Sequence, residues 1–187
     1  MLYYEYMLTP IPKIKAMILF FANHTDPRLL GKVKLMKLFY FADFAHVKKH
    51  GAPITYDNYV HLEHGPIPST IMNLVDAAET DTDNAILSDS ISIEVKENSL
   101  QKRIIPLRKF AEKDAKYFSE NELSVMEAIC QRFYDKNAKF IEDASHKEAA
   151  WKKTFESELI PYTLAAEDPD CLVDKETIEL SLKVMNN

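Results

Sequence analysis

The sequence predicts an α+β, mainly α fold, with a small β-hairpin or short antiparallel sheet packed on a single helical domain. Apolar residues recur at helical spacing in several segments, most densely over residues 31–49. Residues 90–96 (SISIEVK) alternate between apolar and polar side chains, which indicates a strand. The chain has only three glycines, too few for the many tight turns of an all-β sandwich.

We interpret residues 1–187 as one domain. A chain of this length buries roughly 70% of its unfolded surface, so it needs no disulfide or metal ion for stability. Its two cysteines, Cys130 and Cys171, are far apart and require no disulfide, which indicates a cytoplasmic protein. The formal charge of −6 disfavours nonspecific binding to nucleic acid or anionic lipid. The apolar run at residues 16–22 is too short to span a membrane.

The N-terminal part is expected to contain an extended segment and a helix. Residues 1–9 are rich in aromatic side chains and are closed by Pro10 and Pro12. A first helix is expected over residues 12–22, because proline suits the first helical turn, where its missing N–H costs no hydrogen bond. One face of this helix is apolar, formed by Ile14, Met17, Ile18 and Phe21.

The second helix is expected from residue 31 or 32 to residue 49. Two adjoining apolar stripes predict a helix buried on most of its circumference. Lys34, Lys37 and Lys48 are assigned to the remaining polar strip, in contact with solvent. Gly51 stands at the position of a C-cap glycine, after basic residues that suit the negative end of the helix.

An extended segment and a third helix follow. Residues 53–62 include Tyr59, a good strand residue. Gly65-Pro66 marks a turn, and a helix is expected over residues 68–79.

A β-hairpin is predicted in the middle of the chain. Residues 90–96 form its first strand, residues 97–99 its turn and residues 102–108 its second strand. Pro106 places the second strand at a sheet edge, because proline has no N–H to donate to a neighbouring strand.

Two capping boxes predict helix starts in the last third of the chain. Ser119 with Glu122 opens one helix, and Ser145 with Glu148 opens another that carries Trp151. The lone tryptophan is interpreted as a core residue.

Two further segments complete the prediction. A shorter helix is expected between the two boxes, over residues 137–144. Residues 163–187 are harder to assign, because residues 177–184 alternate like a strand but also fit helical spacing. We favour a helix there.

A metal site is one functional hypothesis. Asp43, His46 and His50 fall on one face of the second helix, and His61 and His64 follow shortly. Imidazole and carboxylate groups are zinc ligands, but the H-E-x-x-H pattern of a zinc protease is missing. Hydrogen-bonded surface and turn residues are the simpler interpretation. A metal-dependent enzyme therefore stays the second alternative.

A DNA-binding transcriptional regulator is the first alternative, since short helices and a hairpin can form a winged helix-turn-helix. The acidic net charge counts against it, so nucleic acid would need a local basic patch. Candidate residues for that patch are Lys32, Lys34, Lys37, Lys48, Lys49, Lys102, Arg103, Arg108 and Lys109. No nucleophile motif such as G-x-S-x-G is present, so we expect neither an enzyme nor a cofactor.

Several short motifs occur in order along the chain. They are Lys34-Leu35, Lys37-Leu38, Tyr40-Phe41-Ala42-Asp43, His46, Gly51, Pro53-Ile54, Tyr59, Gly65-Pro66, Ser145-His146 with Trp151, and Ile160-Pro161-Tyr162. With these motifs the chain resembles the Panacea domain, the family that includes SocA-like antitoxins and prophage-associated proteins of the GepA type. The resemblance covers about residues 14–162. His64 departs from the pattern, because an aromatic residue commonly precedes Gly-Pro in the family.

The resemblance implies a mainly α antitoxin of a toxin–antitoxin system. Such a protein would neutralise a cognate toxin, encoded next to it, by direct protein binding. One branch of the family acts instead as a proteolytic adaptor that delivers its toxin to a protease. A homo-oligomer is compatible with this function. The family-motif residues that we take as candidates for partner binding are Tyr40, Asp43, His46, Pro53, Tyr59, His64, Gly65, Pro66 and Trp151. The turn region 51–69, with Tyr59 and His64, is the first place to expect an exposed binding surface.

Overall fold

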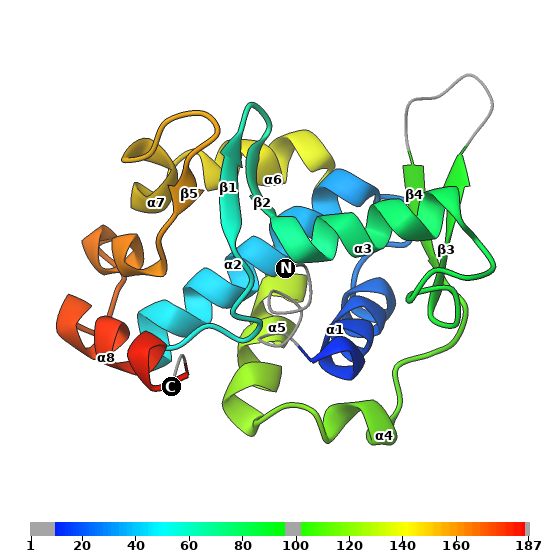
Figure 1. The fold of residues 1–187 in the computed structure, drawn as a ribbon, viewed down its shortest axis with the longest axis horizontal. Coiled ribbons are helices and arrows are strands. Elements are labelled where there is room, and N and C mark those ends of the chain that lie inside the picture. Colours follow the sequence, from blue (N-terminus) through cyan, green and yellow to red (C-terminus); the bar gives the residue numbers. More distant parts are fainter. Residues whose placement is uncertain (1–9, 96–101, 186–187) are drawn as a thin grey trace, which may run out of the picture.

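Helix α2 (Lys32–His50) runs through the middle of the molecule, and the other elements are arranged around it (Figure 1). The computed structural model describes residues 10–95 and 102–185. The remaining helices are α1 (Ile11–His24), α3 (Ser69–Thr80), α4 (Glu112–Ala115), α5 (Glu120–Phe133), α6 (Ala138–Ser145), α7 (Ala149–Lys152), α8 (Lys175–Met185) and the 3-10 helix η2 (Tyr162–Glu167). The strands are β1 (Tyr59–Leu62), β2 (Gly65–Pro68), β3 (Ile91–Val95), β4 (Lys102–Pro106) and β5 (Leu159–Ile160). The predicted mainly α, α+β class is confirmed.

Helix α2 is buried around nearly its whole circumference. It packs against α5, α6, β2 and η2, so no side of it is left as a broad solvated strip. The prediction that Lys34, Lys37 and Lys48 face solvent is therefore wrong, because all three are buried. The predicted C-cap is confirmed: Gly51 adopts φ +80°, and its N–H donates to the carbonyl of Val47 at 2.8 Å.

A three-stranded antiparallel sheet lies beside α2, in the order β2-β1-β5. Strands β1 and β2 form a hairpin in which Tyr59 pairs with Pro68 and Leu62 with Gly65. Strand β5 joins β1 from about 100 residues further along the chain, with Tyr59 opposite Ile160. The sequence predicted the extended segment at β1 but took Gly65-Pro66 as a turn. Strand β2 tolerates its two prolines because it is an edge strand.

A second sheet consists of the hairpin β3–β4, with Ile91 opposite Pro106 and Val95 opposite Lys102. This confirms the two predicted strands. The expected turn at residues 97–99 and the extended segment at residues 1–9 lie outside the described residues.

Of the two capping boxes that the sequence predicts, one forms and the other does not. The box at α5 is confirmed, since Ser119 Oγ accepts from the N–H of Glu122 and Glu122 Oε2 accepts from the N–H of Ser119. The second box is wrong: Ser145 Oγ donates instead to the carbonyl of Glu142 at 2.7 Å. Helix α7 is capped from a distance, because Asp168 Oδ1 accepts the N–H of Ala149 at 2.8 Å.

Helices α6 and α8 occur where the sequence favoured helices, and the short α4 was not predicted. Within the described ranges, no helix combines the length and the apolar character needed to cross a membrane.

Candidate functional site

Asp43, on α2, holds together the segments around the β1–β2 hairpin. Its Oδ1 accepts the backbone N–H groups of Ile54 and Thr55 at 2.7 and 2.8 Å. Its Oδ2 accepts hydrogen bonds from three hydroxyl groups: that of Thr55, that of Tyr59 at 2.8 Å and that of Tyr162 at 3.3 Å. The carboxyl group is fully buried. It thus anchors the loop before β1, strand β1 and helix η2 to one point of α2.

The ionisation of Asp43 follows from two opposing effects. Burial raises the pKa of this carboxyl group to about 6, whereas the hydrogen bonds from Thr55, Tyr59 and Ile54 lower it. At pH 7 the carboxylate form prevails, which suits a group that accepts from five donors. The Asp43 carboxylate thus serves to hold neighbouring segments in place. Within the described network, neither a nucleophile nor a free base accompanies this carboxylate.

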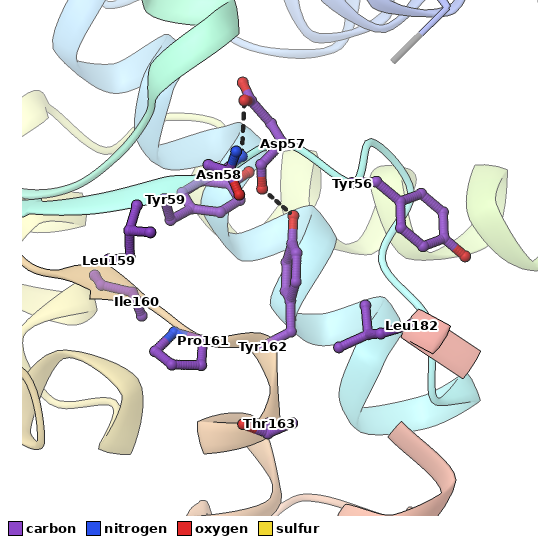
Figure 2. A pocket seen from close by; sticks show the side chains of 10 residues that line it. All are labelled: Tyr56, Asp57, Asn58, Tyr59, Leu159, Ile160, Pro161, Tyr162, Thr163 and Leu182. Atoms are coloured by element: carbon purple, nitrogen blue, oxygen red, sulfur yellow. Dashed lines mark hydrogen bonds between the residues drawn. The ribbon is translucent and has the colours of Figure 1, made fainter. Parts of the chain in front are cut away.

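A second buried carboxylate, Asp57, caps α3. Its Oδ1 accepts the N–H of Thr70 at 3.1 Å and its Oδ2 the N–H of Ile71 at 2.9 Å. Pro68, which precedes α3, has no side-chain acceptor, so the cap comes from the loop before β1. The hydroxyl of Tyr162 donates to the carbonyl of Asp57 at 2.7 Å. Figure 2 shows Tyr162 pointing at this carbonyl.

A pocket of about 300 Å³ opens next to these two carboxylates. Its walls come from three separate parts of the chain: the loop leading into β1, the segment from β5 into η2, and α8 (Figure 2). The lining residues are Tyr56, Asp57, Asn58, Tyr59, Leu159, Ile160, Pro161, Tyr162, Thr163 and Leu182. Because Asp57, Tyr59 and Tyr162 belong to the hydrogen-bonded network, the inner wall of this pocket is held in a fixed shape.

Lys37 forms a further buried polar contact, on the other side of the hairpin. Its Nζ donates to the carbonyl of Pro66 at 2.8 Å. Burial lowers the pKa of Lys37 to about 7, partly offset by the nearby negative charge of Glu142. Gly65 lies directly over this amine, and its own φ is +95°. A side chain at position 65 would meet Lys37 Cε and Ser145 Oγ, each at 2.8 Å.

The substitution Gly65→Ala is expected to lower the free energy of unfolding by about 2–4 kcal/mol. Alanine would have to keep the φ of +95°, which is unfavourable for a residue with a side chain, and its Cβ would collide with two buried groups. Chemical denaturation measures the change. The control is Gly31→Ala, at a helix N-cap with φ −96°, which alanine adopts readily. Equal losses for the two variants would contradict the close packing at Gly65.

Trp151 stacks on two histidine rings. Its ring stacks on His61, with centroids 3.3 Å apart, and on His146, with centroids 4.3 Å apart. The side chain is only half-buried, so the interpretation of Trp151 as a core residue is wrong. The reason is its position on α7, a helix of four residues at the edge of the molecule (Figure 1). The stack instead joins α7, strand β1 and the C-cap residue of α6, His146.

Most of the remaining candidate residues are buried, and one is exposed to solvent. Tyr40, Asp43, His46, Pro53, Tyr59, Gly65 and Pro66 are all buried. His46 Nδ1 donates to the carbonyl of Ala52 at 2.6 Å, which ties α2 to the following turn. The expectation that Tyr59 forms part of an exposed surface is wrong, because its ring packs against Tyr40, Phe44 and Tyr162. His64 is exposed, and its role in partner binding stays a prediction.

A family model described as "Antitoxin SocA-like, Panacea domain" matches residues 35–152, more than half of the chain. The chain belongs to this family. Comparison with curated proteins and with solved structures gives no match. The Panacea-domain match begins inside α2 and ends with α7, so it contains Asp43, the Lys37 contact and the Trp151 stack. It stops short of β5, η2 and α8, which form the outer walls of the pocket.

The structure brings the rings of His46 and His50 to 4.6 Å from each other but, among the described residues, does not gather the proposed metal ligands into one group of three. The carboxylate of Asp43 faces Thr55 and Tyr59, whereas His46 binds a backbone carbonyl and His61 contacts the hydroxyl of Thr154. A different group, Glu142, Asp143 and His146, brings its ligand atoms within 4.8 Å of one another. Lys139 forms ion pairs with both of these carboxylates, so part of their charge is already compensated.

The basic residues of the regulator hypothesis do not form one patch. Lys34 Nζ donates to the carbonyl groups of Tyr134 and Lys136 at 3.0 and 2.7 Å, and so satisfies the C-terminal end of α5. Lys48 pairs with Glu148, Asp168 and Asp170 at 3.0–3.1 Å. Acidic partners also pair with four of the others: Lys32 with Asp76, Lys102 with Glu79, Arg103 with Glu94 and Arg108 with Asp114. Such pairing removes much of the positive potential that phosphate contacts require.

Proposed function

We propose that this chain is the antitoxin of a toxin–antitoxin pair and neutralises its cognate toxin by direct protein binding, without catalysis. The observation that carries the proposal is membership of the SocA-like antitoxin, Panacea domain family. The engagement of Asp43, His46 and Lys37 in structural hydrogen bonds supports a scaffold role for these polar groups.

The partner in this proposal is a toxin protein encoded by a neighbouring gene, and the setting is the cytoplasm. The whole chain acts as one domain, since the pocket beside β5 and α8 is built from residues inside and outside the family match. The two free cysteines agree with a reducing compartment.

Co-expression tests the proposal. The neighbouring reading frame alone is expected to arrest growth, and co-expression of this chain is expected to restore growth and to give a complex that co-purifies. The proposal is wrong if the neighbouring product is not toxic, or if growth returns without a complex and without loss of the toxin.

Delivery to a protease is a variant of the same proposal. In that variant the toxin disappears only when both this chain and the protease are present. A degradation assay with purified toxin, with and without this chain, separates the variant from simple neutralisation, in which the toxin persists in a stable complex.

A further inference from the structure

The free edge of the three-stranded sheet has a defined hydrogen-bonding geometry. Strand β5 pairs with β1 on one side, and in the described part of the chain no strand pairs with its other side. The N–H of His61 donates to the carbonyl of Glu158, and Tyr59 lies opposite Ile160. Since bonded and non-bonded pairs alternate in antiparallel sheets, the N–H and C=O of Leu159 point away from β1, toward the open edge.

The pocket shares two of its lining residues, Leu159 and Ile160, with strand β5. Leu159, Ile160 and Pro161 line one of its walls, and Tyr56 and Leu182 stand across from them (Figure 2). A strand added at Leu159 would run past the mouth of the pocket and could direct a side chain into it. The lining is mainly apolar and aromatic, so it suits an apolar side chain.

The surface around the edge combines exposed apolar and acidic side chains. Phe155 is 76% exposed, Leu159 63% and Leu62 40%. Exposed carboxylates of Glu63, Glu156 and Glu158 lie in the same two segments. Nearby Lys153 is paired with Glu167. The positive charge of Lys152 therefore stands against the three negative charges of these carboxylates, and the sum is negative. The edge is therefore apolar with a net negative rim, a combination that favours a basic partner.

We propose that the partner protein inserts an extended segment at the free edge of β5. Its backbone pairs with Leu159, an apolar side chain enters the pocket lined by Tyr56, Pro161 and Leu182, and flanking lysine or arginine residues face Glu156 and Glu158. This inference rests on the proposed function, and it assigns the toxin-binding surface and the chemistry of the segment that binds there.

A second copy of this chain is a poorer occupant of the edge. Antiparallel pairing of two β5 strands would bring Glu156 and Glu158 of one copy close to those of the other, and like charges at an interface cost binding energy. The negative rim therefore selects a partner of opposite charge.

Four variants test the surface. The test ligand is the purified product of the neighbouring toxic reading frame, in an inactivated form, titrated against the full chain by calorimetry. Leu159→Asp is expected to weaken binding at least tenfold, because it places a charge where the apolar contact forms. Glu156→Lys is expected to weaken binding several-fold and to reduce its dependence on salt. The matched controls, Leu107→Asp and Glu127→Lys, alter exposed residues away from the edge and are expected to leave binding within twofold.

The outcomes separate this inference from the proposed function. If the wild-type chain does not bind the neighbouring toxin, the proposed function fails. If the wild type binds and Leu159→Asp binds equally well while remaining folded by thermal melting, the edge is not the binding surface. Equal effects of Leu159→Asp and Leu107→Asp would also overturn the inference. A concentration-dependent dimer lost in Leu159→Asp but kept in Leu107→Asp would show that a second copy occupies the edge instead.

Discussion

Replacing Asp43 by alanine is expected to lower the free energy of unfolding by about 4 kcal/mol or more. The substitution removes one acceptor group and leaves five donors without their partner: the N–H groups of Ile54 and Thr55 and the hydroxyls of Thr55, Tyr59 and Tyr162. Each buried donor without a partner costs about 1–3 kcal/mol, and part of this is recovered where a water enters. Chemical denaturation with far-UV circular dichroism measures the loss.

Two further variants make the test specific. Asp43→Asn keeps one oxygen for the backbone N–H groups but presents an NH₂ donor to Tyr59 and Tyr162, so an intermediate loss is expected. Asp83→Ala, at an exposed loop residue, is expected to change stability by less than about 0.5 kcal/mol. If Asp43→Ala were no worse than Asp83→Ala, Asp43 would not anchor the loop to α2.

The consequences reach the proposed binding surface. Asp43 holds Tyr162 and Tyr59, and both residues line the pocket beside β5. A chain that folds with Asp43→Asn is therefore expected to bind its partner more weakly even though position 43 lies out of the partner's reach. Such an effect would show that the pocket depends on the buried network for its shape.

Local sequence signals predicted the parts of the fold that depend on local chemistry. Helix α2 and its Gly51 cap follow from apolar spacing and from a glycine after a basic turn. The capping box of Ser119 and Glu122 marks the start of α5 because both of its hydrogen bonds lie within four residues. In each case the partner of a residue is a near neighbour in the chain.

The errors arise where the partner lies far away in the sequence. Periodicity places Lys34, Lys37 and Lys48 on a polar strip, but it cannot show that distant carbonyl and carboxylate groups cover that strip. Similarly, the second capping box failed because Asp168, about 20 residues further along, caps α7. Buried lysine amines matched to remote acceptors have no signature in a single sequence.

The candidate site was predictable only in part, for the same reason. The family motifs placed both Asp43 and Tyr59 among the candidate residues, and in the structure the hydroxyl of Tyr59 donates to the carboxylate of Asp43. Asp57 was missed, although one signal existed: Pro68 cannot cap α3, so another acceptor had to do so. The pocket and the free edge at Leu159 depend on three segments that meet only in the folded chain.

The pH dependence of stability is expected to report on Lys37. Its pKa lies at about 7 in the folded chain, below the 10.5 of a free lysine, because burial disfavours the charged amine. Between these values the unfolded chain binds a proton that the folded chain has lost, so the contribution of Lys37 to stability rises with pH. From pH 7 to pH 9 the rise is about 2 kcal/mol for this single group.

The variant Lys37→Met isolates this contribution. Methionine fills similar space without a charge, so the unfolding free energy of the wild type minus that of the variant is expected to increase by about 2 kcal/mol from pH 7 to pH 9. Taking the difference cancels the other titrating groups, including Cys130 and the buried tyrosines, whose raised pKa values affect the wild type and the variant alike. Lys49→Met, at an exposed lysine near the end of the same helix, serves as the control and is expected to give a flat difference. Parallel profiles for the wild type and Lys37→Met would mean that the amine of Lys37 keeps its proton in the folded chain, and that the contact with Pro66 is made by a charged group.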